Sequence, residues 1–181
     1  MPSVSDSSSD RLIAGFAALA VVIQVLETSF PSPIPGIKPG LANAVTLIVL
    51  LRHGWRTAAW VSALRVLAGS LLTGSFLAPA FWLSASGALC SLLALGLCAQ
   101  WNRLSPSLAL SAIGLSVISA LAHMSGQFFV AYHWFVPHPG VFHLLPILMS
   151  AALLFGIVTG AATQQILRRL KPIAARPILL P

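Results

Sequence analysis

Charged side chains are scarce in this sequence. Only 7% of its 181 residues are charged, whereas 57% are hydrophobic. A soluble domain carries about 25% charged residues, so these few charges cannot cover the surface of a water-soluble globule. We therefore expect an all-α integral membrane protein with several helices, each needing about 20 apolar residues to cross roughly 30 Å of hydrocarbon.

Acidic residues and cysteines are rarer still. The acids are Asp6, Asp10 and Glu27, which excludes most carboxylate catalysis. The cysteines, Cys90 and Cys98, lie in apolar sequence and are too few for a disulfide scaffold. The chain also lacks the phosphate loop G-x-x-x-x-G-K-S/T, so it cannot hydrolyse ATP by that route. We expect no enzymatic activity, no resident cofactor and no metal site.

Breaks rich in proline and glycine divide the apolar sequence into six expected helices. These helices cover residues 12–29, 39–51, 57–72, 80–100, 107–130 and 143–167. The second is too short to span a bilayer and must be part-buried among the others. We predict a six-helix membrane domain at 12–168, a disordered tail at 1–11 and a basic cytoplasmic tail at 169–181. A signal peptide is disfavoured for the first helix, because acids precede it and no clear cleavage site follows.

The cations favour one side of the membrane. With six crossings, the termini and the connections after the second and fourth helices share a side. Eight cations fall there: Arg11, Arg52, Arg56, Arg103, Arg168, Arg169, Lys171 and Arg176. Lys38 alone lies in the opposite connections, and Arg65 lies inside a helix. This bias predicts cytoplasmic termini in a bacterial-type inner membrane, and it explains the net charge of +7 without a nucleic-acid partner.

Arg65 is the most informative polar residue. It lies about 12 Å along the third expected helix, near the midplane, where an unpaired charge costs several kcal/mol or more. Ser62, Arg65, Gly69 and Thr73 recur at helical spacing and form a stripe that must face inward. Arg65 either binds helix-end carbonyls or pairs with Glu27 to lock the bundle, or it contacts a ligand.

The first connection and the helices beside it hold the other outer polar groups. Glu27 lies near the end of the first helix, and it either pairs with a cation or binds a ligand. Residues 35–43 include Lys38 and Asn43 at the start of the second helix. Free amides at a helix start and the Lys38 ammonium can form an anion site, although Lys38 can also extend to lipid headgroups.

The fifth helix carries a polar stripe. Ser116, Ser119, His123 and Gln127 are three, four and four residues apart, so they share one face. Each polar group in hydrocarbon needs a hydrogen-bond partner. For a whole stripe of such groups, water in a hydrated cavity provides these partners most easily. We therefore expect this face to line a cavity.

Five segments resemble a known family. Glu27 with residues 33–43 (PIPGIKPGLAN), then residues 65–74 (RVLAGSLLTG), 79–87, 123–127 (HMSGQ) and 156–160 (GIVTG) resemble the Gx transporter family. That family is also labelled heptaprenyl diphosphate synthase component I. It is similar in size and six-helix architecture to the substrate-binding S components of energy-coupling-factor transporters. The resemblance implies capture of a small molecule from outside, with a coupling membrane protein and ATPases as partners.

Two functions remain open at this point. The first is a membrane transport subunit that binds an anionic or zwitterionic vitamin, cofactor or isoprenoid precursor. Its expected ligand-binding residues are Glu27, Lys38, Asn43, Arg65, His123 and Gln127. The alternative is a non-catalytic membrane component of a heptaprenyl diphosphate synthase. An autonomous synthase is not expected, because such enzymes bind diphosphate through magnesium on clustered aspartates, and both aspartates lie in the N-terminal tail.

Overall fold

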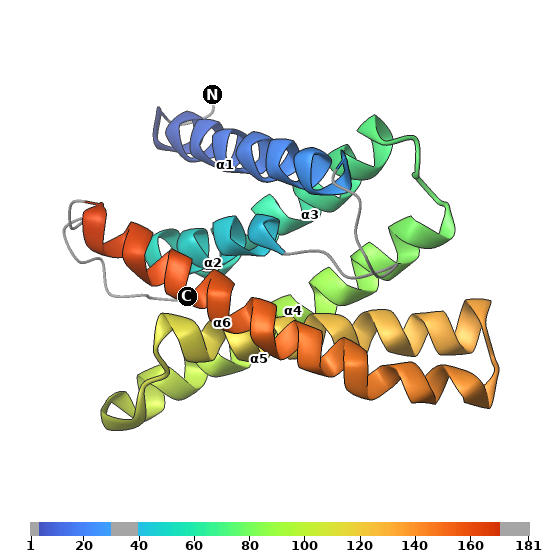
Figure 1. Ribbon diagram of the computed structural model, residues 1–181. Coiled ribbons are helices and arrows are strands. Elements are labelled where there is room, and N and C mark those ends of the chain that lie inside the picture. Colours follow the sequence, from blue (N-terminus) through green and yellow to red (C-terminus); the bar gives the residue numbers. More distant parts are fainter. Residues whose placement is uncertain (1–3, 30–39, 171–181) are drawn as a thin grey trace.

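The computed structural model describes residues 4–29 and 40–170, and within these ranges all regular secondary structure is helical (Figure 1). The α-helices are α1 (Val4–Ser29), α2 (Leu41–His53), α3 (Trp55–Leu72), α4 (Pro79–Leu104), α5 (Ala112–Val130) and α6 (Leu145–Arg169). Short helical turns η1 (Pro106–Leu108), η2 (Ala131–Phe135) and η3 (Pro139–Leu144) connect the last three. The predicted all-α class with six helices and a short second helix is confirmed.

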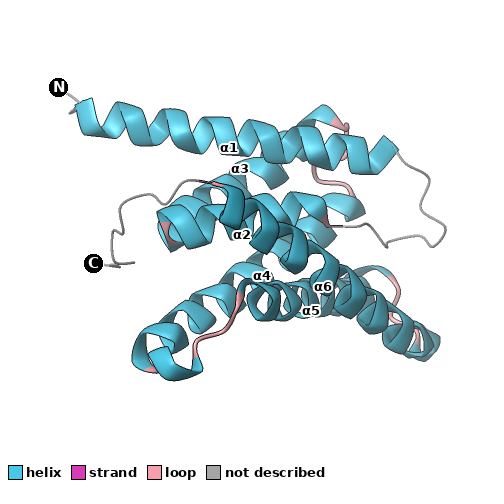
Figure 2. Cartoon of the chain, turned by 60° about the vertical axis from the view of Figure 1, so that its left-hand side comes forward, coloured by secondary structure: helices cyan, strands magenta, loops and turns pink. Residues whose placement is uncertain are grey.

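The helices form two groups that lie one above the other. α1 crosses over α2 and α3, while α4, α5 and α6 pack side by side beneath them (Figures 1 and 2). Contacts of α3 with α4, and of α2 with α6, join the two groups. α2 lies between α1 and the lower group, which is why residues 44–50 are all buried. The expectation that a helix too short to span would be shielded by its neighbours is therefore met.

Among the described residues, four helical segments are long and apolar enough to cross a membrane. They are Ser9–Glu27, Pro79–Leu104, Ala112–Phe135 and Pro139–Arg169. Large apolar side chains such as Leu89 and Leu97 of α4 lie on the outer surface with 58% and 73% exposure. An apolar surface of this kind is suited to lipid, since no other helix of the described chain covers it.

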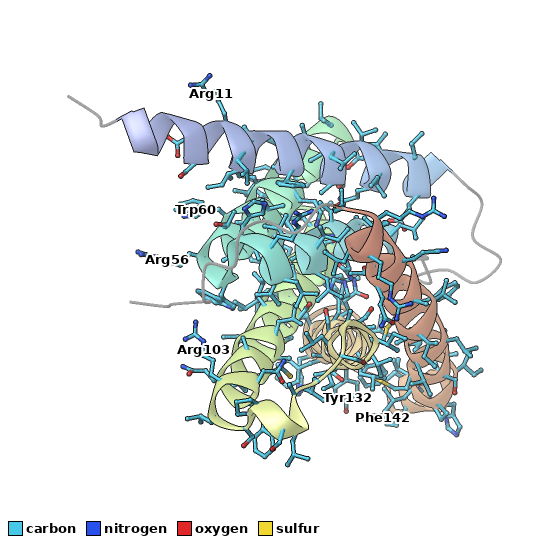
Figure 3. The ribbon with its side chains drawn as sticks, turned by 90° about the vertical axis from the view of Figure 1, so that its left-hand side faces the viewer. Arg11, Arg56, Trp60, Arg103, Tyr132 and Phe142 are labelled. Carbon is cyan, nitrogen blue, oxygen red and sulfur yellow. The ribbon has the colours of Figure 1, made fainter. Side chains whose placement is uncertain are left out.

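The described arginines other than Arg65 gather at one end of the molecule. The start of α1, the α2–α3 turn, the α4–α5 connection and the end of α6 meet at the left of Figure 1. These segments carry Arg11, Arg52, Arg56, Arg103, Arg168 and Arg169. Figure 3 looks at this end, with Arg11, Arg56 and Arg103 extending outward. We call it the basic end, and the other the distal end.

Two helix starts differ from the sequence prediction. α1 begins at Val4 instead of Leu12, so residues 4–11 continue the helix where a disordered tail was expected. α5 begins at Ala112 instead of residue 107. The side chain of Asn102 accepts a hydrogen bond from the Leu110 amide at 2.8 Å, and the Ser111 hydroxyl accepts one from the Gly114 amide at 3.2 Å. These bonds hold residues 109–111 out of the helix and cap its first turn.

Close contact between α5 and α6 depends on two glycines. A Cβ atom on Gly160 would lie 2.7 Å from the Ile113 Cα, and one on Gly156 would lie 3.0 Å from the Val117 Cα. Both neighbours are backbone atoms, which cannot move aside as a flexible side chain can. The Gly156–Gly160 spacing therefore serves close helix packing.

Candidate functional site

A cavity of about 260 Å³ lies between the two helix groups. Every α-helix contributes to its wall: Gln24 and Glu27 from α1, Asn43 from α2, Arg65 from α3, Ser84 from α4, His123 and Gln127 from α5, and Thr159 from α6. Glu27 lies near the end of α1, and Gln127 near the end of α5, so the cavity extends from the distal end toward the middle. A volume of this size suits a small metabolite.

Five of the six predicted ligand-binding residues line this cavity. They are Glu27, Asn43, Arg65, His123 and Gln127. The sixth, Lys38, lies outside the described residues, as does most of the connection expected to form an anion site. The α5 stripe also meets its expectation, since Ser116 and Ser119 line the cavity with His123 and Gln127. Whether these residues bind a ligand remains a prediction.

Arg65 is buried, with 6% of its surface exposed. Its Nη1 donates a hydrogen bond to the Asn43 Oδ1 at 2.9 Å, which fixes the guanidinium against the first turn of α2. Its Nε is buried and finds no hydrogen-bond partner in the described part of the chain. Since an unsatisfied buried donor is costly, Arg65 is a side chain whose hydrogen bonds the described residues do not complete.

Glu27 contacts a different group from the one expected. Its Oε1 accepts a hydrogen bond from the Leu41 amide at 2.6 Å, so a side chain of α1 caps the start of α2. α2 needs this external acceptor, because its own N-cap is Gly40, which has no side chain and adopts φ 74°. The carboxylate also lies where the partial positive charge of the helix start attracts it.

Glu27 and Arg65 do not form the ion pair that was considered from the sequence. Their charges attract each other, but no direct ion pair joins these two residues in the structure as described. Glu27 instead binds the Leu41 amide, and Arg65 instead binds Asn43. Part of the expected anion site at the start of α2 is likewise occupied by Glu27.

His123 contributes a second unsatisfied nitrogen. Its Nδ1 is buried without a hydrogen-bond partner among the described residues. The ring packs so closely on α4 that a Cβ atom on Gly87 would lie 2.7 Å from the His123 Nε2. Gly87 therefore leaves the space that the imidazole occupies at the cavity wall.

The polar stripe of α3 is only partly internal. Ser62 is 2% exposed, and Gly69 is buried with the Gln24 side chain against it, since a Cβ atom there would lie 2.6 Å from Gln24 Nε2. Thr73 was expected on the same inward face but is exposed. It follows the last residue of α3 and donates a hydrogen bond to the Gly69 carbonyl at 2.9 Å, which satisfies its hydroxyl locally.

Sequence reasoning missed the contributions of α4 and α6. Ser84 and Thr159 add polar groups, while Leu83, Met124 and Phe155 add apolar surface to the cavity. Thr159 follows Gly156 by three residues and therefore shares its face of α6, a spacing that could have indicated its position. The apolar residues gave no such signal, because apolar side chains fill most of this sequence.

The described residues provide little for metal chemistry. No group of three or more His, Cys, Asp or Glu side chains within residues 4–29 and 40–170 lies close enough to hold a metal ion. The histidines nearest the distal end have other neighbours: the His133 ring contacts Phe129, and His138 Nδ1 accepts a hydrogen bond from the Gly140 amide. The cavity wall combines hydrogen-bonding side chains with apolar ones.

Comparison with known proteins gives one match. A family model described as heptaprenyl diphosphate synthase component I matches residues 16–166 of this chain. The matched region contains all the described cavity residues. No curated protein and no solved structure matches the chain.

Proposed function

This chain belongs to the heptaprenyl diphosphate synthase component I family, and from that premise we propose that it is a membrane subunit that binds a small anionic or zwitterionic metabolite. The binding site is the cavity between the two helix groups. The observation that carries this proposal is a cavity lined by polar residues from all six α-helices, including the buried Arg65 and the imidazole of His123. A ligand that accepts hydrogen bonds would pair with donors of both side chains.

The proposed orientation places the basic end in the cytoplasm. Arginines gather on the cytoplasmic side of membrane proteins, and the described arginines other than Arg65 lie at one end of this molecule. Both termini are then cytoplasmic, and the cavity faces the outside of a bacterial-type inner membrane. A metabolite would enter from the distal end, close to Glu27 and Gln127.

In this proposal the chain takes up its ligand with the help of partners. It carries no phosphate loop of its own, so an energy-coupling membrane protein and its ATPases would supply the energy for uptake. The outer face of α1 offers a docking surface, because Ala14, Gly15 and Ala18 are exposed and a Cβ atom on Gly15 would meet no atom within 4 Å. Small residues of this kind let another helix approach closely.

The family name supports a second candidate. The chain could act as a non-catalytic membrane component that anchors a soluble synthase in isoprenoid biosynthesis. The chain itself would not catalyse prenyl transfer, because it holds three acidic residues and Mg²⁺-diphosphate sites need clustered carboxylates.

Two measurements separate these candidates. Native mass spectrometry of the gently extracted protein identifies co-purified small molecules and subunits, and vesicle assays measure flux. A co-purified metabolite with uptake supports the transport subunit. Co-purification with a prenyl synthase, without flux, supports the anchor and contradicts the transport proposal.

Substitution of Arg65 tests whether this residue binds the metabolite. We expect Arg65→Ala to lower affinity for the co-purified metabolite by at least tenfold while the protein still inserts and folds, with Arg56→Ala at the exposed basic end as the control. Equilibrium dialysis with the labelled metabolite measures the change. Unchanged affinity would contradict the binding role, and loss of folding with retained affinity in the surviving protein would make Arg65 structural.

A further inference from the structure

We propose that the outer surface of α3 and α4 at the basic end binds an anionic phospholipid, with the lipid phosphate at Arg56 and the acyl chains along the leucines of both helices. This site lies outside the cavity and does not depend on the proposed function. The surface, called the α3–α4 flank, consists of exposed side chains from the two helices: Arg56, Trp60, Leu64, Leu67, Leu93 and Leu97.

The exposed face of α3 changes from charged to aromatic to apolar along the helix. Arg56 is exposed in the first turn, and Trp60 follows one turn later with 62% of its surface exposed. Leu64 and Leu67 continue the same face. From Arg56 to Leu67 the helix rises by about 16 Å, and one leaflet contributes about 15 Å of hydrocarbon. A phospholipid presents phosphate, glycerol and hydrocarbon in the same order and over a similar depth.

Trp55 fixes the orientation of α3 on α4. Its Nε1 donates a hydrogen bond to the Leu92 carbonyl at 3.1 Å, and a Cβ atom on Gly96 would lie 2.9 Å from the same nitrogen. One residue further along a helix turns about 100° from such a contact, so Arg56 and Leu93 point out of the α3–α4 interface. Because the two helices run in opposite directions (Figure 1), both side chains turn toward the same side.

Positive charge gathers on this side of the basic end. Figure 3 shows Trp60, Arg56 and Arg103 on one side of the molecule, one below the other. Arg103 belongs to the last turn of α4 and is half-buried, so it adds a second positive charge to the flank without extending as far as Arg56. A negatively charged headgroup is therefore attracted to this side.

Two tryptophans of α4 give the depth of the flank in the membrane. Trp82 and Trp101 are both exposed, and their separation along the helix corresponds to about 28 Å. The hydrocarbon core is roughly 30 Å thick, and tryptophan prefers its two boundaries. Trp101 therefore marks the boundary at the basic end, with Arg103 just beyond it. The long side chain of Arg56 can extend to the same headgroup layer.

The other exposed arginines of the basic end lack this arrangement. One turn inward from Arg169 lies Gln165, and one turn inward from Arg11 lies Gly15. Neither residue supplies an aromatic ring at the boundary. A general attraction between cations and anionic lipids would treat these positions alike, whereas an ordered site needs the charge, the indole and the leucines on one face.

The chemistry of the flank favours an anionic lipid over two other partners. Residues 28–181 contain no Asp or Glu, so the amine of a zwitterionic headgroup would find no acid to pair with beside Arg56. An acidic soluble protein could contact Arg56 but could not follow Leu64 and Leu67 into the hydrocarbon. An anionic phospholipid contacts both the charge and the leucines.

Brominated phospholipids test this site, because bromine quenches tryptophan fluorescence on contact. The full-length protein is reconstituted in phosphatidylcholine vesicles, and the signal of Trp60 is obtained by subtracting the spectrum of Trp60→Phe. Increasing fractions of brominated phosphatidylglycerol, or of brominated phosphatidylcholine with the same chains, are then added. We expect phosphatidylglycerol to bind beside Trp60 about fivefold more strongly than phosphatidylcholine, as one arginine near a headgroup contributes.

Three variants assign this preference to the flank. Arg56→Gln should abolish most of it, and Arg56→Lys should retain it, since the charge remains. Arg169→Gln is the matched control, because it removes one positive charge from the same end and should keep the full preference. Metabolite affinity should be unchanged in Arg56→Gln, because the cavity lies toward the distal end.

Several results would overturn the lipid site. Equal quenching of Trp60 by the two lipids in the unaltered protein is the first. A preference that persists in Arg56→Gln, or that falls equally in Arg169→Gln, would assign the attraction to the net charge of the basic end. An acidic protein that co-purifies with the unaltered chain but not with Arg56→Gln, without any lipid preference, would assign Arg56 to a protein partner.

Discussion

Glu27 shows how one side chain can define both a helix start and a cavity wall. Its carboxylate accepts the Leu41 amide at 2.6 Å and also lines the cavity. Sequence analysis identified Glu27 as a site residue because it is an isolated acid in apolar sequence. It could not identify the partner, since the Leu41 amide is fourteen residues away and reaches Glu27 only through the packing of α1 on α2.

We predict that Glu27→Ala lowers the free energy of unfolding by about 1 kcal/mol, because the start of α2 loses its acceptor and Gly40 cannot replace it. Glu27→Gln keeps an acceptor oxygen and should lose less. Thermal unfolding in detergent measures both variants. Equal stability of Glu27→Ala and the unaltered protein would show that the Leu41 hydrogen bond contributes nothing to folding.

Among the elements, helix ends were harder to predict than helix interiors. The bounds of α2 and α3 differ from expectation by at most two residues, because glycine breaks such as Gly54, with φ 89°, are visible in the sequence. The predicted start of α5 was wrong, because the hydrogen bond from the Leu110 amide to Asn102 depends on a contact between the segment before α5 and the end of α4. The α5 polar stripe was predictable, since helical spacing alone puts its members on one face.

The α5–α6 interface gives a prediction at this scale. Gly160→Ala should destabilise the protein by about 1–3 kcal/mol, because its Cβ atom would lie 2.7 Å from the Ile113 Cα and the two backbones must separate. Gly114→Ala is the matched control on α5. The nearest atom to its Cβ would lie at 3.6 Å, an ordinary contact, so stability should be unchanged or slightly higher. Equal melting temperatures for the two variants would contradict the role assigned to Gly160.

At the scale of the whole molecule, the cavity and the basic end lie at opposite ends of the bundle. α1–α3 and α4–α6 enclose the cavity toward the distal end, while the described arginines outside the bundle mark the other end (Figures 1 and 3). The charge bias was visible in the sequence, and so were most of the polar cavity residues. The apolar wall was not, because only tertiary packing decides which leucines and phenylalanines face a cavity and which face lipid.

The account depends on a hydrated cavity that opens at the distal end, and cysteine labelling tests this directly. In a background with Cys90→Ala and Cys98→Ala, Ser84→Cys places a thiol in the cavity wall, and Leu89→Cys places one on the lipid-facing side of the same helix. We predict that a membrane-impermeant anionic methanethiosulfonate, added outside intact cells, modifies Ser84→Cys at least tenfold faster than Leu89→Cys. Equal rates, or modification of Ser84→Cys only in inside-out vesicles, would contradict the account.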